Sequence, residues 1–428
     1  MLAIGIDLGT TGIGGVLFDT DSNKVIKSIM KTSNAFIKTD KDYEKIQDTE
    51  KIVSIAKSIL DELLEYNKNV SAIGVTGQMH GIVYLDSDGI AVSPLYTWQD
   101  ERASLKNASC VSYADMLSTS VGYGFATDYY NRENGLVPKN AVTFCTIADY
   151  LVMRLTKRKT PVIHTTNLAS FGCFNLENFS TKAEINAEIS NGYTIAGEFN
   201  GIPVAVAIGD NQASVLSTTN KDGALINVGT GSQVSVITDK IIYSLGIETR
   251  PYFENKYLAV GSALCGGRAY SLIKDFFGEI IRAKVEISDD ELYQIMNSFL
   301  EKTDKFSVKC DTRFAGVRFE DGVSGSYSNV TVNNFTPSEF LRATLFGMAE
   351  ELYSFYQKIG VKKSVLIGSG NGVRKNKHFI SILKNVFDSD LKLSPYTEEA
   401  SVGASIYALI SAGFYADMET AQSKLNIG

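Results

Sequence analysis

Two short apolar runs, one in each half of the chain, break into turns of glycine and threonine. This pairing constrains the fold more than any other feature. Residues 4–11 read Ile-Gly-Ile-Asp-Leu-Gly-Thr-Thr, and residues 224–232 read Ala-Leu-Ile-Asn-Val-Gly-Thr-Gly-Ser. Each predicts a strand feeding a turn whose glycines let the backbone approach a ligand and whose amides and hydroxyls face it. The pair of turns favours a protein whose two halves bind a nucleotide phosphate chain from opposite sides. The alternative interpretation is two ordinary glycine turns that follow strands.

The composition is that of a globular protein large enough for two domains. The length of 428 residues exceeds what one hydrophobic core usually fills. The contents of 44% hydrophobic and 21% charged residues are ordinary for a globular protein. No run resembles a membrane span, and the start of the chain lacks the basic and apolar regions of a secretory signal. A net charge of −7 argues against a nucleic-acid surface. Five scattered cysteines fit the reduced cytoplasm and argue against a metal–thiolate site.

An alternation of strands and helices indicates where the chain divides. Asp48 or Thr49 begins a predicted helix whose apolar residues recur at three- and four-residue spacing, and a strand at 72–75 follows. The pattern restarts near Gly201 with the apolar run 202–208, which is typical of a strand buried on both faces. We therefore expect domains at residues 1–200 and 201–428.

Three later segments also predict elements. Thr336-Pro337-Ser338-Glu339 has the pattern of a capping box with proline at the first helical position, and the helix should run towards Gln357. Residues 365–367 predict another buried strand. The small residues in 398–405 indicate a helix that packs closely against its neighbours.

Two aspartates stand where apolar strands end. Asp7 precedes two hydroxyls and suits a magnesium ion beside phosphates, because Mg²⁺ prefers one or two carboxylates plus phosphate oxygens. A turn aspartate that caps its own backbone is the other interpretation. Asp210 follows the 202–208 strand at the position where ligands gather in open parallel sheets, and it suits the base that takes a proton from an alcohol. A helix N-cap is the alternative.

Polar and aromatic residues at other strand ends suit a small polyol. Gln78-Met79-His80 follows the 72–75 strand, and His80 is one of three histidines. Trp98, the only tryptophan, precedes Asp100 and Arg102, and an apolar ring with converging polar groups suits a sugar. A structural histidine and a surface loop anchored by tryptophan are the alternatives. The glycine-rich stretch at 368–372 follows a strand and by itself is weak evidence of a nucleotide contact.

Taken together, these motifs resemble the FGGY carbohydrate kinases. The resemblance runs through the chain in order, at residues 7–11, 77–81, 98–102, 209–213, 227–231 and 368–370. It implies an α/β fold of two ribonuclease H-like domains, as in the actin/Hsp70-type ATPases, flanking a deep cleft. The first domain would bind the sugar and the second ATP. A homodimer is compatible with it, and neither nucleic acid nor a membrane is an expected partner.

The resemblance assigns roles to individual residues. Asp210 would be the catalytic base and Asp7 would organise Mg²⁺. The sugar would be bound by Gln78, Met79, His80, Trp98, Asp100, Arg102 and Asn211. ATP would be bound by Gly9, Thr10, Thr11, Gly229, Thr230, Gly231, Gly370 and Asn371.

The implied reaction is ATP-dependent phosphorylation of a terminal primary hydroxyl of a small ketose. Motifs at 75–83, 122–127 and 167–172 are similar to those of the sedoheptulose-phosphorylating members, while xylulose-phosphorylating members share Gln-Met-His-Gly at 78–81 and Gly-Asp-Asn at 209–211. Glu101, where a glycine is common, Thr165, where an acid is common, and the short chain depart from the family pattern. These departures leave the reaction class intact and put the sugar in doubt.

Two other classes of protein are weighed against this one. A non-catalytic sensor of the same fold would bind sugar and nucleotide but has no need of a base at Asp210. An Hsp70-like ATPase would require a peptide-binding domain beyond these two halves.

Overall fold

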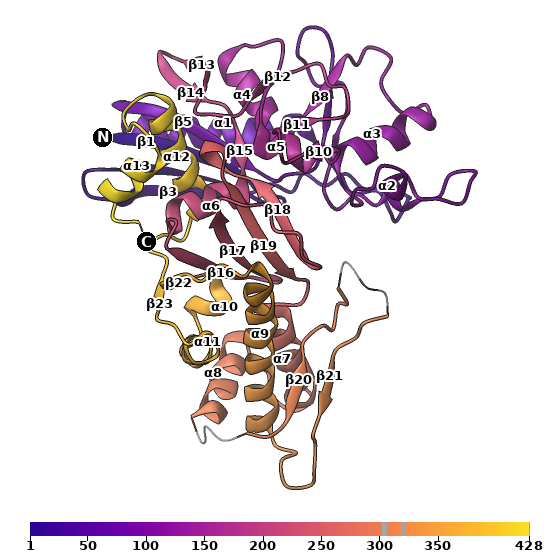
Figure 1. The fold of residues 1–428 in the computed structure, drawn as a ribbon, viewed down its shortest axis with the longest axis vertical. Coiled ribbons are helices and arrows are strands. Elements are labelled where there is room, and N and C mark those ends of the chain that lie inside the picture. Colours follow the sequence, from indigo (N-terminus) through magenta and orange to yellow (C-terminus); the bar gives the residue numbers. More distant parts are fainter. Residues whose placement is uncertain (302–305, 318–319, 321, 428) are drawn as a thin grey trace. The chain divides into compact units, whose positions relative to one another are not determined.

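The structure is a computed structural model that describes residues 1–301, 306–317, 320 and 322–427. Its contacts group the chain into two units, each of α/β architecture (Figure 1). The first unit comprises Met1–Asn220, Arg250–Lys256 and Glu398–Ile427, and the second comprises Lys221–Thr249 and Tyr257–Thr397. The division at residue 200 stays a prediction, and the late segment Glu398–Ile427 belongs to the first unit.

The first unit is built on a seven-stranded sheet with the order β13-β14-β5-β1-β2-β3, in which β15 also pairs with β5. The hairpins β1–β2 and β2–β3 are antiparallel, and β5 is parallel to β1, β14 and β15. The strands span β1 Leu2–Leu8, β2 Gly12–Asp19, β3 Lys24–Thr32, β5 Val70–Gly77, β13 Ile195–Phe199, β14 Ile202–Ala205 and β15 Ile208–Gly209. The parallel strands therefore end at one edge of the sheet.

Helices and short strands surround this sheet. The helices are α1 Thr49–Tyr66, η1 Arg102–Ser104, α2 Tyr113–Met116, α3 Gly124–Glu133, α4 Ile147–Thr156, α5 Thr165–Ser170, α6 Asp210–Thr218, α12 Glu399–Ser411 and α13 Met418–Lys424. The short strands are β4 Ile46–Gln47, β6 Val83–Leu85, β7 Leu95–Tyr96, β8 Thr143–Cys145, β9 Val162–His164, β10 Phe174–Asn175, β11 Ser180–Thr181 and β12 Glu188–Ser190. Asp48 is the N-cap of α1, as the sequence predicted, and accepts a hydrogen bond from the Lys51 amide.

Small residues let α12 lie against the sheet of the first unit. Its buried positions contact β1, β5 and α6, and Figure 1 shows α12 and α13, in yellow, beside the N-terminal strands. A Cβ atom on Gly5 would lie 1.7 Å from the Ser401 carbonyl oxygen, and one on Gly74 would lie 1.9 Å from that of Ala404. The predicted close packing of 398–405 is confirmed, and glycine in β1 and β5 is what permits it.

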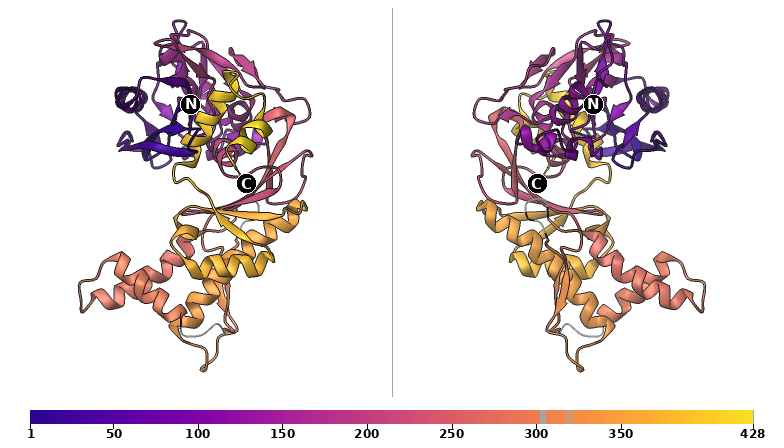
Figure 2. Two further views of the ribbon diagram at one scale, coloured as in Figure 1. Left: turned by 90° about the vertical axis from the view of Figure 1, so that its left-hand side faces the viewer. Right: turned by 90° about the vertical axis from the view of Figure 1, so that its right-hand side faces the viewer.

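The second unit is built on a six-stranded sheet with the order β18-β19-β17-β16-β22-β23. The strands span β16 Gly223–Val228, β17 Ser232–Thr238, β18 Ile247–Pro251, β19 Tyr257–Ala263, β22 Val365–Ser369 and β23 Leu391–Leu393. The remaining elements are η2 Phe253–Asn255, which lies in the first unit, and α7 Gly267–Arg282, α8 Asp289–Leu300, β20 Lys309–Asp311, β21 Ser326–Ser328, α9 Pro337–Ile359, α10 Asn371–Arg374 and α11 Lys377–Phe387. Helices α7, α8 and α9 contact one another (Figure 2).

The two sheets share one strand order. In β3-β2-β1-β5-β14 and in β19-β17-β16-β22-β23, successive pairs are antiparallel, antiparallel, parallel and parallel. The two Gly-Thr turns therefore occupy equivalent hairpins, β1–β2 and β16–β17. This internal repeat explains why the motif recurs in each half of the sequence.

Two predictions about local structure were wrong in detail. The apolar run 202–208 forms two strands, β14 and β15, because the Val206 amide donates to the Thr194 carbonyl and the chain leaves β5 between them. Thr336 caps α9 as predicted, but the Glu339 carboxylate accepts from the Ser307 and Val308 amides and does not complete a capping box. Helix α9 ends at Ile359, where Gly360 adopts a left-handed conformation.

Candidate active site

Three parallel strands of the first unit bring the predicted chemistry to one edge of the sheet. Asp7 of β1 pairs with Thr76 of β5, and Leu8 pairs with Gly77. On the other side of β5, Ile208 and Gly209 pair with the same two residues. Asp7, Gln78 and Asp210 therefore leave adjacent strands at the same level, as ligand-binding residues do in open parallel sheets.

The charge of Asp210 affects the protonation of Asp7. Both side chains are half-buried. Burial, and to a smaller extent the charge of Asp210, together raise the pKa of Asp7 to about 7. Burial also raises the pKa of Asp210, while the nearby Arg250 guanidinium opposes that rise. A pair of carboxylates that resist ionising together is a donor set that a divalent cation with phosphate ligands would stabilise.

The structure weighs against the helix-cap interpretation of Asp210. The N-cap of α6 is Gly209, and Asp210 is the first residue inside the helix. One Asp210 carboxylate oxygen accepts from the Asn211 amide at 2.6 Å. Arg250 of β18 donates from Nη1 to the Asn211 side-chain oxygen at 3.3 Å. Arg250 was not predicted from the sequence, because nothing local marks an arginine that contacts α6 from a strand about 40 residues later in the chain.

The Gly9–Thr11 turn is held in place from two sides. A Cβ atom on Gly9 would lie 2.7 Å from the Gly12 carbonyl oxygen, so the turn requires glycine there. The Thr10 carbonyl accepts from Gln47 Nε2 at 2.7 Å, and Trp98 Nε1 donates to Thr10 Oγ1 at 3.0 Å. Trp98, which is 42% exposed, thus lies beside this turn. The contact between them was not predicted.

Gln78, Met79 and His80 continue from the end of β5. Gln78 and Met79 are buried, and a Cβ atom on Gly209 would lie 2.7 Å from the Met79 sulfur. His80 adopts a positive φ of 72°, and its ring stacks on Tyr123 with centroids 4.3 Å apart.

A hydrogen bond identifies the proton on the His80 ring. His80 Nδ1 lies 2.8 Å from the Ser170 carbonyl oxygen. Because a carbonyl only accepts, Nδ1 carries the proton, and Nε2 is the acceptor nitrogen of the neutral ring.

Asp100 and Arg102 bind each other inside the loop that carries Trp98. Their side chains are 0% and 2% exposed, and Arg102 Nε lies 2.6 Å from Asp100 Oδ1. Arg102 also donates to Asn131 at 2.7 Å and stacks on Tyr96 at 4.2 Å. Their direct contact with a sugar stays a prediction, and the observed arrangement is that of a buried pair that shapes the loop.

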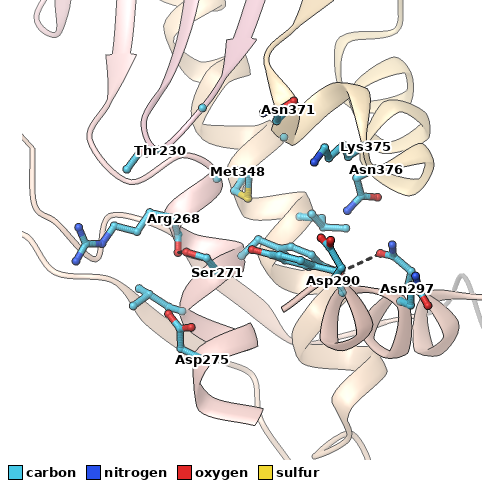
Figure 3. Close-up of a pocket in the computed structure, with 18 residues that line it drawn as sticks. Thr230, Arg268, Ser271, Asp275, Asp290, Asn297, Met348, Asn371, Lys375 and Asn376 are labelled. Atoms are coloured by element: carbon cyan, nitrogen blue, oxygen red, sulfur yellow. Dashed lines mark hydrogen bonds between the residues drawn. The ribbon is translucent and has the colours of Figure 1, made fainter. Parts of the chain in front are cut away.

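The second unit contains a cavity of about 910 Å³ at the start of α7 (Figure 3). Of the predicted nucleotide contacts, Gly229, Thr230 and Asn371 line it. Its wall consists of Gly229, Thr230, Gly267, Arg268, Tyr270, Ser271, Leu272, Asp275, Asp290, Tyr293, Gln294, Asn297, Leu345, Met348, Asn371, Gly372, Lys375 and Asn376. Most of these residues come from α7, α8 and α10, so they are distant in sequence.

Backbone contacts fix the Gly229–Gly231 turn against α7. The Gly267 amide donates to the Gly229 carbonyl at 3.0 Å, and the Arg268 amide donates to that of Thr230 at 3.1 Å. Gly231 and Gly370 do not line the cavity. Cβ atoms there would lie 2.9 Å from the Ala263 oxygen and 2.4 Å from the Val228 oxygen, so both glycines permit close backbone packing behind the wall.

Several residues of this cavity were not predicted from the sequence. Figure 3 shows Arg268 at the same end as Thr230, with Lys375 and Asn376 at the other end near Asn371. Tyr270 and Tyr293, which also line the cavity, stack on each other with ring centroids 6.1 Å apart. The Gly266-Gly267 pair at a strand-to-helix junction was the sequence signal that could have found the start of α7.

Two features are absent from the part of the chain that the structure describes. No group of three or more His, Cys, Asp and Glu side chains suited to a metal occurs among them. Within the same part of the chain, no helix has both the length and the apolarity needed to cross a bilayer.

Comparison with known proteins identifies the family of this chain. Models of the N-terminal and C-terminal domains of the FGGY family of carbohydrate kinases match residues 2–121 and 224–412. The human protein named sedoheptulokinase is 25% identical, covering 95% of this chain and 97% of its own length. A xylulose kinase from Staphylococcus epidermidis is 22% identical, covering 98% of this chain and 90% of its own length.

Solved structures share the fold. Ligand-bound xylulose kinase from Lactobacillus acidophilus has a TM-score of 0.83 at 20% identity, covering 99% of this chain and 92% of its own. Plasmodium falciparum glycerol kinase with ADP has a TM-score of 0.82 at 19% identity, covering 100% and 92%. The expected fold class, two ribonuclease H-like domains of the actin/Hsp70 type, is confirmed. The chain belongs to the FGGY family of carbohydrate kinases.

Proposed function

We propose that this carbohydrate kinase transfers the γ-phosphoryl group of ATP to a terminal primary hydroxyl of a small ketose, with sedoheptulose as the preferred acceptor. The observation that carries the proposal is the pair of carboxylates, Asp7 and Asp210, at adjacent strand ends beside a Gly-Thr turn. Sedoheptulose is favoured because the human relative of that specificity matches across 95% of the chain.

In this mechanism Asp210 accepts the proton of the attacking hydroxyl. Its position at the start of α6, unused as a cap, leaves the carboxylate to align the hydroxyl oxygen with the phosphorus atom. Arg250 supports the ionised form of Asp210 through its positive charge. Asn211, which Arg250 orients by a hydrogen bond, would contact the sugar beside the base.

Asp7 would hold Mg²⁺, and the donor set fits that ion. Two half-buried carboxylates near each other, one with a pKa of about 7, gain from a cation that compensates their charge. The bound ion would neutralise charge on the phosphate oxygens. The Gly9–Thr11 turn would add its amides and hydroxyls to the same phosphates.

The remaining sugar contacts would come from Gln78, His80 and Trp98. The Met79 side chain packs against Gly209, and the Asp100–Arg102 ion pair stabilises the loop that carries Trp98. His80 Nε2 would accept a hydrogen bond from a sugar hydroxyl, because Nδ1 donates to the Ser170 carbonyl.

The nucleotide would occupy the cavity of the second unit. Thr230 and the Gly229 backbone would face phosphates, and Asn371 would face the nucleoside end of the cavity. This assignment agrees with the predicted role of residues 201–428 in nucleotide binding, except that Asp210 and Asn211, proposed at the sugar, belong to the first unit. We also propose, from the sequence alone, that the protein is cytoplasmic and forms a homodimer.

A kinase of xylulose or another pentulose is the second candidate, because a xylulose kinase matches 98% of the chain at 22% identity. A panel of ketoses and polyols, with ADP formation measured by a coupled assay, separates the candidates. The proposal expects the highest kcat/KM with sedoheptulose. A higher value with xylulose would favour the pentulose kinase, and ADP formation with glycerol alone would contradict both.

A further inference from the structure

A buried chain of hydrogen bonds joins the predicted sugar site to the predicted phosphate turn. Gln78 Nε2 lies 3.0 Å from Gln47 Oε1, and Gln47 Nε2 lies 2.7 Å from the Thr10 carbonyl oxygen. Gln47 is 0% exposed, and Gln78 is 4% exposed. Gln47 comes from β4, an element that carries none of the predicted site residues.

The direction of each hydrogen bond in this chain is determined. A carbonyl oxygen only accepts, so the Gln47 group that faces Thr10 must be the amide NH₂. The Gln47 oxygen then faces Gln78, which must present its own NH₂ in return. The other amide atom of Gln78, Oε1, is left as an acceptor.

Gln78 Oε1 has no donor within hydrogen-bond distance in the described part of the chain, and it is shielded from solvent. A buried acceptor without a donor costs free energy. A sugar hydroxyl enclosed beside it is a donor of the right type. The orphaned oxygen therefore marks the side of Gln78 on which an acceptor alcohol would lie.

We infer that Gln47 is a positioning residue that orients Gln78 towards the alcohol and at the same time holds the Thr10 carbonyl of the phosphate turn. The inference rests on the proposed function in placing the acceptor alcohol at Gln78. Its consequence is that one side chain adjusts the apparent affinity for both substrates. No contact of Gln47 with either substrate is required.

Two substitutions at Gln47 distinguish its hydrogen bond to Gln78 from its hydrogen bond to the Thr10 carbonyl. Gln47→Met keeps the length of the side chain and removes both hydrogen bonds, so KM for the alcohol and KM for ATP should each rise about five- to tenfold. Gln47→Glu keeps an oxygen towards Gln78 but turns a carboxylate oxygen to the Thr10 carbonyl. It should raise KM for ATP by roughly tenfold and leave KM for the alcohol within about twofold of the parent value.

Gln422→Met is the matched control. Gln422 is also a buried glutamine of the first unit, and its Nε2 donates to the Leu216 and Thr219 carbonyls. It should lower the thermal midpoint as Gln47→Met does and leave both KM values unchanged.

The measurement is steady-state kinetics of the full chain with the best alcohol of the panel, so it remains valid if that alcohol is not a ketose. The inference is overturned if Gln47→Met shifts the KM values no more than Gln422→Met, or if Gln47→Glu shifts both equally. If Gln47→Met does not fold, Gln47→Glu alone tests the inference: a rise of KM for ATP without a rise of KM for the alcohol supports it, and an equal rise of both overturns it. Failure of the proposed function would appear as a different best substrate in the panel of ketoses and polyols, and it would not change the ratios of variant to parent KM.

Discussion

Replacing Asp7 by asparagine should stabilise the metal-free protein at neutral and alkaline pH. The ordinary carboxyl pKa of 3.8 rises to about 7 in the folded protein, because burial and the charge of Asp210 disfavour ionisation. This difference corresponds to roughly 4 kcal/mol at 1.36 kcal/mol per pKa unit. Solvent at the half-exposed edge of Asp7 screens part of it, so we expect about 1–2 kcal/mol.

The pH dependence gives the sign of this effect. A raised carboxyl pKa contributes stability that is fully present below pH 3.8 and is lost as the pH rises to about 7. Asp7→Asn cannot ionise and escapes that loss. In EDTA at pH 8, its thermal unfolding midpoint should exceed that of the parent by about 2–6 °C, and the two midpoints should converge as the pH approaches 4.

Asp19→Asn is the control of opposite sign. Asp19 lies at the end of β2, the neighbour of β1, and hydrogen bonds from Ser22 and the Asp21 amide lower its pKa. Its replacement should reduce stability at pH 8. If Asp7→Asn lowered the midpoint at pH 8, or raised it equally at pH 4 and pH 8, the argument that the Asp7 charge is destabilising would be wrong.

Two further substitutions test the cavity of the second unit and the loop that carries Trp98. Thr230→Val removes a hydroxyl from the cavity wall. It should weaken ATP binding by about tenfold or more while the thermal unfolding midpoint stays unchanged. An ATP affinity equal to that of the parent, measured by calorimetry, would contradict the placement of the phosphates. Asp100→Asn removes the nearer carboxylate of the 2% exposed Arg102 guanidinium and leaves that of Glu44, at 3.8 Å. It should cost roughly 3 kcal/mol, measured by denaturant unfolding, and a loss below about 0.5 kcal/mol would show that the pair is not a structural element.

The local parts of the fold and site were predictable from the sequence. The strand-and-turn patterns at residues 4–11 and 224–232 correspond to the hairpins β1–β2 and β16–β17, and the α1 cap at Asp48 is confirmed. Asp7 and Asp210 were each predicted at a strand end. The effect of Asp210 on the pKa of Asp7 follows from the pairing of both strands with a shared neighbour, β5, which the sequence pattern does not record.

The long-range contacts were not predictable. Gln47 belongs to a two-residue strand, and its hydrogen bonds to Gln78 and Thr10 depend on how three separate segments meet. Spacing also could not show that Arg102 turns back to Asp100 inside the loop, because an irregular loop, unlike a strand, has no fixed period that decides which side chains share a face. The return of Glu398–Ile427 to the first unit is likewise a property of the assembled fold.

The central claim, that Asp210 is the base of a phosphoryl transfer, is tested most directly by the turnover of Asp210→Asn. Asparagine keeps the shape of the side chain and a hydrogen bond to the substrate hydroxyl but cannot accept its proton. With the best alcohol of the panel and saturating ATP, kcat from coupled ADP detection should fall by about 10² to 10⁴, while KM for the alcohol changes little. A kcat within a few-fold of the parent value would contradict the assignment of Asp210 as the base.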